Sequence, residues 1–241
     1  MKKNFNPHIY LFCFLLSLMS IAYADDSNVS GVTATHEWPK LNFYVGFGMG
    51  VGTTDWSQLV DHDYDPLVDL SAPTSVNSGG MTTDLFVGYK ILDRFAIEAR
   101  YVHYPQASIH FRHVNMHEIL PIDPIPTPVP NPYGLYDFST DTNSVAIVGK
   151  FYVPIVKRWH LRAFADVGIN YTQRKDIMVG TQGDYMPTFG GGIVWRFAPR
   201  FQTSFEFQYA VGDGASTFDP VKQFMPFLYN ADLRLAYLFN I

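Results

Sequence analysis

Apolar and polar residues alternate along much of this chain, and the alternation continues to its end. In the last segment Leu233, Leu235 and Tyr237 are apolar, whereas Asp232 and Arg234 occupy the intervening register. A period of two is that of a β-strand with one apolar and one polar face. The same pattern occurs in eight segments, at 41–52, 82–91, 94–104, 143–153, 159–172, 187–197, 201–211 and 230–241. The chain is therefore predicted to be all-β.

The connections between these segments alternate between short and long. The tight turns are 92–93, 154–158 and 198–200, and the long polar or proline-rich loops are 54–81, 105–142, 173–186 and 212–229. Tilted strands of about ten residues, with short turns at one end and long loops at the other, are typical of outer-membrane barrels. The pattern predicts an eight-stranded antiparallel up-and-down transmembrane β-barrel over 41–241, with short periplasmic turns and long extracellular loops.

Volume decides which face of these strands is predicted to lie inside. A soluble barrel would place the apolar face inward, but the lumen of an eight-stranded barrel has room only for modest side chains. Several large apolar residues per strand, many of them aromatic, would overpack it. The other face is rich in small residues, such as Gly46, Gly48, Gly190 and Gly192. We therefore expect the apolar face to contact lipid and the small, polar face to line the lumen.

Charged residues of both signs lie on the predicted lumen face. They are Asp84, Lys90, Glu98, Arg100, Lys150, Arg162, Asp166, Arg196, Glu206, Asp232 and Arg234. Buried charges persist in proteins when they are paired and hydrogen-bonded. Because the two signs nearly balance, the pattern predicts a lumen charge network of salt bridges. A solvated outer face with scattered charges is the alternative.

Aromatic residues gather near the predicted strand ends. Trp38, Phe43, Trp159, Trp195, Phe197, Phe201 and Phe239 fall near the periplasmic side, and Tyr101, Tyr104, Tyr171 and Tyr209 near the outer side. Aromatic rings favour the boundary between lipid and water. These residues are therefore predicted to form the two aromatic girdles of a membrane barrel. Ordinary core aromatics are the alternative, but they would not cluster at the two ends of the strands.

The N-terminus has the features of a secretory signal. Lys2 and Lys3 precede an apolar run at 9–21, which ends at the A-x-A site Ala22-Tyr23-Ala24. A membrane anchor is the alternative, but the run is short for a spanning helix. We therefore expect 1–24 to be a signal peptide and 25–40 a periplasmic lead-in to the barrel.

Charge and cysteine content exclude several classes of function. The formal net charge of −5 argues against a nucleic-acid partner. The one cysteine, Cys13, lies in the predicted signal, so neither a disulfide framework nor a thiolate metal site is expected. No cofactor is predicted.

The loop predicted at 105–142 contains one weak candidate for metal binding. His110, His113 and His117 have the spacing of residues on one helix face, from which imidazoles can bind zinc. A polar loop with surface histidines is the simpler interpretation, because prolines follow closely. Those prolines, at alternate positions over 124–132, predict an extended segment that is either a docking ridge or a stiff loop.

Taken in order, the segments resemble the transmembrane domain of the OmpA-like family, including the small opacity-type surface proteins. The residues that carry the resemblance are Phe43-Tyr44-Val45-Gly46-Phe47-Gly48, Gly88-Tyr89-Lys90, 95–101, 149–154, 189–192, 195–197 and the closing strand. The family usually ends in Phe, whereas this chain ends in Ile241. The resemblance covers the barrel domain only and implies a place in the bacterial outer membrane. The partners that it implies are the lipid bilayer, lipopolysaccharide and, through the C-terminal strand, the barrel-assembly machinery.

These features together predict a structural and surface-interaction barrel without catalysis. The long loops would contact a host or another surface partner. A narrow porin-like channel for small solutes or ions is the first alternative, if the lumen charges can rearrange. A lipid A-modifying enzyme is the second, although the His-x-Ser arrangement of a lipid A deacylase is absent from the sequence.

Overall fold

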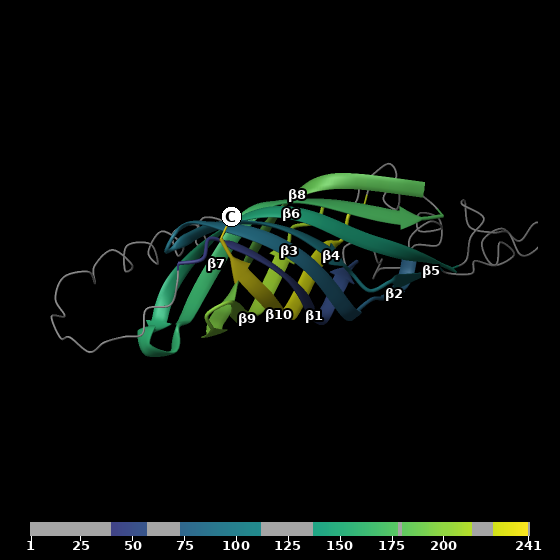
Figure 1. Ribbon diagram of the computed structural model, residues 1–241. Helices are drawn as coiled ribbons and strands as arrows, with labels where there is room; N and C mark the ends of the chain where they lie inside the picture. Colours follow the sequence, from purple (N-terminus) through teal and green to yellow (C-terminus); the bar gives the residue numbers. More distant parts are fainter. Residues whose placement is uncertain (1–39, 57–72, 112–136, 178–179, 214–223, 241) are drawn as a thin grey trace, which may run out of the picture. The chain divides into compact units, whose positions relative to one another are not determined.

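A computed structural model describes residues 40–56, 73–111, 137–177, 180–213 and 224–240. Eight of its strands form a ring in which each strand pairs antiparallel with the next, and β1 pairs with β10 to close it (Figure 1). The strands of this ring are β1 (Phe43–Asp55), β3 (Gly80–Leu92), β4 (Phe95–His103), β6 (Asp137–Val156), β7 (Leu161–Asp176), β8 (Gly180–Ala198), β9 (Phe201–Ala210) and β10 (Phe227–Phe239). The predicted eight-stranded barrel is confirmed.

Two short strands, which the sequence pattern does not predict, lengthen the sheet on the loop side. They are β2 (Pro73–Asn77) and β5 (Ala107–Phe111), and β5 pairs with both β2 and the first residues of β6. Figure 1 shows these two strands beyond one end of the barrel strands. The alternation pattern assigns both segments to loops. That assignment is wrong because strands outside the membrane need no continuous apolar face, so the lipid-facing signal is missing.

The same reason explains a second error, at the predicted loop 173–186. Here β7 continues to Asp176 and β8 begins at Gly180, so the connection is short. The period of two continues through Gln173 and Lys175, which are both polar and exposed. The outward face changes from apolar to polar where a strand leaves the lipid, although the strand itself continues.

At the other end, the turn between β6 and β7 contains a short helix, η1 (Lys157–Trp159). His160 follows η1 in the left-handed conformation, with φ of 51°. The strand predicted at 159–172 therefore begins at Leu161 instead. None of the described residues forms a helix that is long and apolar enough to cross a bilayer.

The two faces of the strands lie as the volume argument predicts. On β9, Phe205 and Phe207 are 56% and 50% exposed, whereas Glu206 between them is fully buried. On β1, Val45 and Phe47 face outward and Tyr44 is buried in the lumen. The apolar belt therefore surrounds the barrel, and the charged register points inward.

Candidate functional site

The lumen is filled in layers, and single strands show their order. On β4, Ala96 lies nearest the short turns; Glu98, Arg100 and Val102 follow toward the loop side, and all are buried. On β10, Leu238 is nearest the short turns, followed by Arg234, Asp232 and Leu228. Because alternate residues of a strand face the lumen about 6–7 Å apart, each strand contributes one side chain to each layer.

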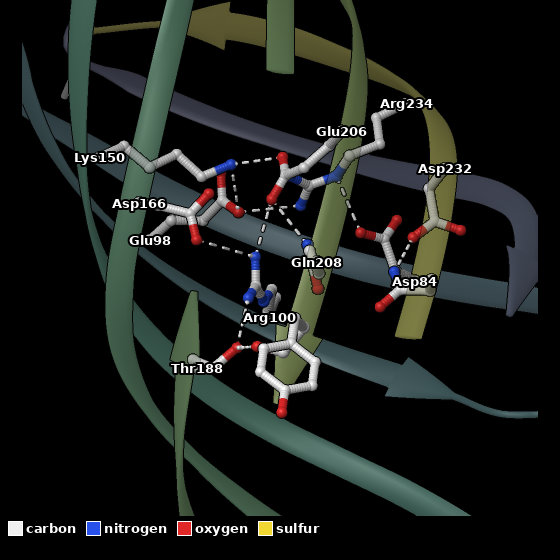
Figure 2. A network of polar contacts seen from close by, with 12 residues as sticks. Asp84, Glu98, Arg100, Lys150, Asp166, Thr188, Glu206, Gln208, Asp232 and Arg234 are labelled. Carbon is white, nitrogen blue, oxygen red and sulfur yellow. Dashed lines mark hydrogen bonds and ion pairs between the residues drawn. The ribbon is translucent and has the colours of Figure 1, made fainter. Parts of the chain in front are cut away.

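The central layer is an ion network built around Glu206 (Figure 2). Its carboxylate accepts hydrogen bonds from Lys150 Nζ at 2.6 Å, from Arg100 at 2.7 Å and from Arg234. Glu98 lies 3.0 Å from Lys150 Nζ and 2.9 Å from Arg234. These side chains come from four strands, β4, β6, β9 and β10, so the network ties distant parts of the barrel wall together.

The three other buried carboxylates of this layer differ in their partners. Asp84 lies 2.8 Å from Arg234 Nε, and Asp166 lies 3.8 Å from Arg100. Asp232 accepts a hydrogen bond from the Thr82 hydroxyl at 2.6 Å and another from Asn230. The network therefore joins four carboxylates, Asp84, Glu98, Asp166 and Glu206, to three cations, Arg100, Lys150 and Arg234, and Asp232 lies beside it with neutral partners.

A glycine makes room for this network. A Cβ atom at Gly48 would meet the Asp84 carboxylate and would lie 2.8 Å from Arg234 Cγ. The small residues of the lumen face therefore leave space for the long charged side chains of neighbouring strands, as the volume argument requires.

On the periplasmic side of the network lies an aromatic layer that the sequence pattern misses. It consists of Tyr44, Phe86, Ala96, Tyr152, Phe164, Val194, Ala236 and Leu238. The Tyr44 hydroxyl donates to Glu98 at 3.0 Å, and the Arg234 guanidinium lies 3.5 Å from the centre of the Phe86 ring. The inner face is therefore rich in small residues, as predicted, but it also carries large aromatic side chains whose grouping into a layer was not predicted. Leu238, a large apolar residue in the polar register, is the signal that could have revealed this layer.

Two further apolar clusters close the loop side of the lumen. The first consists of Val102, Tyr104, Met186, Ala210, Met225 and Leu228. Tyr104 is buried and donates to Asn230 at 3.0 Å, so its predicted place in the outer girdle is wrong. It lies just past the end of β4 but keeps the inward register of Arg100 and Val102, so the alternation itself places it in the lumen.

The second, outermost cluster is the outer cap, formed by Trp56, Ala107, Ile109, Phe138 and Phe224. The Arg174 guanidinium lies 4.8 Å from the Trp56 ring, and its Nε is 2.5 Å from Asp176. Arg174 also donates to the backbone oxygen of Phe224 at 2.9 Å. The alternation assigns both charged residues to a loop and so does not identify this buried ion pair.

Three predicted lumen cations lie apart from the ion network. Lys90, Arg162 and Arg196, here named the basic cluster, are half-buried at the periplasmic end and line one small pocket. Arg162 donates to the backbone oxygen of Asp93 at 3.0 Å, and Arg196 donates to that of Pro199. In the neighbouring turn, partial burial and then the charges of Arg196 and Arg162 lower the pKa of His160 from its ordinary value.

The predicted girdle residues face outward near the strand ends. At the periplasmic end, ring centres are 5.8 Å apart for Trp195 and Phe197, 6.2 Å for Phe197 and Phe201, and 5.8 Å for Phe43 and Phe239. At the outer end they are 5.1 Å apart for Tyr171 and Tyr185 and 4.9 Å for Tyr209 and Tyr229. Tyr101 and Trp159 are also exposed. Trp38 lies outside the described residues, and the girdle role itself stays a prediction.

Of the three histidines proposed as a weak metal site, the structure describes one. His110 lies on β5 rather than on a helix, and its Nδ1 is 3.0 Å from the Asp137 carboxylate. His113 and His117 lie outside the described residues. Within the part of the chain that the structure describes, His, Cys, Asp and Glu side chains form no group of three suited to a metal ion.

Comparison with known proteins places the chain among small membrane barrels. The model of the OmpA-like transmembrane domain matches residues 40–240. OprG of Pseudomonas aeruginosa is 12% identical with a TM-score of 0.50, over 84% of this chain and 98% of that one. Neisserial surface protein A is 9% identical with a TM-score of 0.49, over 82% and 97% of the two chains. No curated protein sequence matches. The chain is thus a transmembrane barrel of the bacterial outer membrane.

Proposed function

The chain belongs to the OmpA-like transmembrane domain family, and from this premise we propose that it is a structural and surface-interaction barrel with a closed lumen and no catalysis. The observation that carries the proposal is the layered filling of the lumen. An ion network lies between apolar layers that occupy the barrel on both of its sides. A continuous aqueous path through these layers would require buried ion pairs to separate, which is costly.

The outer end supports a role in surface contact. Strands β2 and β5 form a small sheet with the start of β6, and their apolar side chains pack in the outer cap. β2 pairs with β5, and its other edge has no strand partner among the described residues. Such an edge can accept a strand of a partner protein. The loops that these strands carry would contribute the specificity for a host or neighbouring surface.

The outward face supports the other proposed partners. The exposed apolar belt contacts the lipid bilayer, and the aromatic side chains at the outer end would meet lipopolysaccharide. Strand β10 closes the ring against β1 in register from Phe43 opposite Phe239 to Asp55 opposite Phe227. Because β10 is the last strand of the barrel in chain order, we propose it as the contact for the barrel-assembly machinery.

Single-channel recording in planar bilayers tests the closed lumen. We expect the folded protein to give no steady open level, and migration that changes on heating before gel electrophoresis would verify that the barrel is folded. A steady, large conductance from folded protein would overturn the proposal in favour of the narrow porin-like channel.

Mass spectrometry of lipid A tests the absence of catalysis. Cells with and without the protein are expected to have the same lipid A acyl pattern. An acyl change that depends on the protein would favour a lipid A-modifying enzyme instead.

A further inference from the structure

The buried charges of the central lumen layer do not balance. They are the carboxylates Asp84, Glu98, Asp166, Glu206 and Asp232 and the cations Arg100, Lys150 and Arg234. Their hydrogen bonds and ion pairs are formed with one another or with uncharged side chains of the described barrel strands. Negative charges are therefore in excess in a layer that apolar layers enclose on both sides. Proteins commonly avoid such an excess by keeping a carboxyl group neutral.

One carboxyl of this layer, that of Asp166, has poorer contacts than the others. Its side chain is fully buried on β7, yet neither oxygen has a hydrogen-bond partner among the described residues. The Arg100 nitrogen that lies 3.8 Å from it is only 2.7 Å from Glu206 (Figure 2). The positive charge of Arg100 is therefore shared between two carboxyl groups, and Glu206 has the closer contact.

The other groups around Asp166 do not supply the missing counter-charge. Lys150 lies opposite it on β6, but the Lys150 Nζ is 3.0 Å from Glu98 and 2.6 Å from Glu206. On β8 the opposite residue is Gly190, where a Cβ would lie 2.7 and 2.8 Å from the two Asp166 oxygens. The charged groups that face Asp166 are Glu98 and Arg100 from β4, Lys150 from β6 and Glu206 from β9. Both cations of this set make their closest contacts with the two glutamates.

The two other aspartates of the layer are better supported in the charged form. Asp232 accepts hydrogen bonds from Thr82 and Asn230, and Asp84 lies 2.8 Å from Arg234 Nε. Hydrogen-bond donors and close cations both stabilise an ionised carboxylate. Because Asp166 has neither at short distance, it is the carboxyl of this layer that is best suited to the neutral form.

We propose that the ion network is a proton-binding site and that Asp166 holds the proton as a carboxylic acid in the folded barrel. A proton removes the charge without needing further space. A metal ion would need several oxygen ligands at once, and the described acidic and histidine side chains form no group of three suited to one. The site links the packing of the lumen to pH, because loss of the proton adds a negative charge between the apolar layers.

Infrared spectroscopy of the folded protein tests the proposal at about pH 5.5, where an ordinary aspartate is ionised. We expect the wild-type protein to show the C=O stretching band of a carboxylic acid, which a carboxylate lacks. The band should disappear reversibly when the pH is raised, and it should be missing from Asp166→Asn. Asp213→Asn, the same substitution at an exposed position, is the matched control and should retain the band.

The pH dependence of unfolding provides a second measurement. The unfolded chain releases the Asp166 proton above about pH 5, whereas the fold retains it. The unfolding equilibrium constant of the wild-type protein, relative to that of Asp166→Asn, should therefore rise about tenfold between about pH 5 and pH 6. Loss of packing alone would change the stability of the variant by the same amount at each pH.

The absence of the band from the wild-type protein would overturn the proposal, and so would its persistence in Asp166→Asn or a ratio of unfolding constants that does not depend on pH. If the variant does not fold, labelling of the aspartate carboxyl groups with ¹³C decides. The label should shift the wild-type band, and an unshifted band would assign the proton to a glutamate instead of Asp166. Conductance does not enter these measurements, so the proton site and the proposed closed lumen are tested separately.

Discussion

The ion network and the basic cluster contain the same types of charged residue but differ in burial and in charge pairing. Both consist of charged residues in the inward register of the barrel strands. In the ion network, cations and carboxylates are fully buried and in contact, as for Glu206 with Lys150 at 2.6 Å. In the basic cluster, Lys90, Arg162 and Arg196 are half-buried at the open end and share one sign of charge.

This difference shows that the position of a charged side chain along the barrel axis decides whether it must be paired with an opposite charge. Deep in the lumen, water is excluded on both sides by apolar layers, so a charge must be paired. At the mouth, solvent screens the charges, so placing three cations near one another costs less free energy. Substitutions in the two regions should therefore have effects of different size.

The largest effect is expected for Glu206→Ala. This change leaves Arg100, Lys150 and Arg234 buried around a missing carboxylate, and loss of one partner of a buried pair costs about 3–5 kcal/mol. Urea unfolding in lipid vesicles, followed by tryptophan fluorescence, measures the loss of unfolding free energy. Asp213→Asn, at an exposed position, is the control and should change it by less than about 0.5 kcal/mol. Equal effects of the two variants would contradict a structural role of the network.

The next effect is expected for Leu238→Ala in the aromatic layer. Leu238 is fully buried, so its truncation should create a cavity and cost about 2–4 kcal/mol. Leu233→Ala, on the lipid face of the same strand, is the comparison because lipid chains can fill the space that it leaves. A loss for Leu238→Ala no greater than that for Leu233→Ala would mean that the aromatic layer is loosely packed.

A much smaller effect on stability is expected for Arg162→Gln. The basic cluster loses one of three like charges, so the unfolding free energy should change by less than about 1 kcal/mol. The same unfolding measurement, compared with Arg234→Gln in the ion network, sharpens the contrast between the two regions. If both arginine variants lose several kcal/mol, the basic cluster is part of the structural core.

The smallest effect concerns the titration of His160. Partial burial and then the positive charges of Arg196 and Arg162 lower its pKa from the ordinary 6.5. Arg196→Gln should raise that pKa toward 6.5, because a proton on His160 would meet less repulsion. Nuclear magnetic resonance of the imidazole ring measures it.

The sign of the linked stability change follows from the same pKa. The unfolded chain binds the His160 proton more tightly than the fold does, so unfolding is favoured slightly as the pH falls through this range. An imidazole in the wild-type protein that titrates at or above 6.5 would show that the basic cluster does not act on it.

Several features of the barrel could be predicted from residue order. The period of two identified all the strands of the ring, and the volume argument placed Phe205 outward and Glu206 inward. The inward residues of the ion network were predicted as a set. Their partners were not predicted, because pairing depends on which side chains of different strands share a height.

Apart from the aromatic layer, the features that sequence reasoning missed lie at the outer end of the barrel, where the strands have no lipid-facing apolar belt. β2 and β5 are short and have no lipid belt, although residues 107–110 of β5 do alternate between buried and partly exposed. Tyr104 was assigned outward although it shares the inward register of Val102. Arg174 and Asp176 read as loop residues until the packing of Trp56 and Phe224 around Arg174 is known.

The sequence by itself determined that the strands alternate, that they close into a barrel and that the bulky face meets lipid, because these properties follow from local periodicity and from the space available in a narrow lumen. Only the tertiary structure decided that Glu206 gathers three cations while Lys90, Arg162 and Arg196 remain together at the mouth. Strand register sets the height of each charge, and the aromatic layer between the two groups separates them.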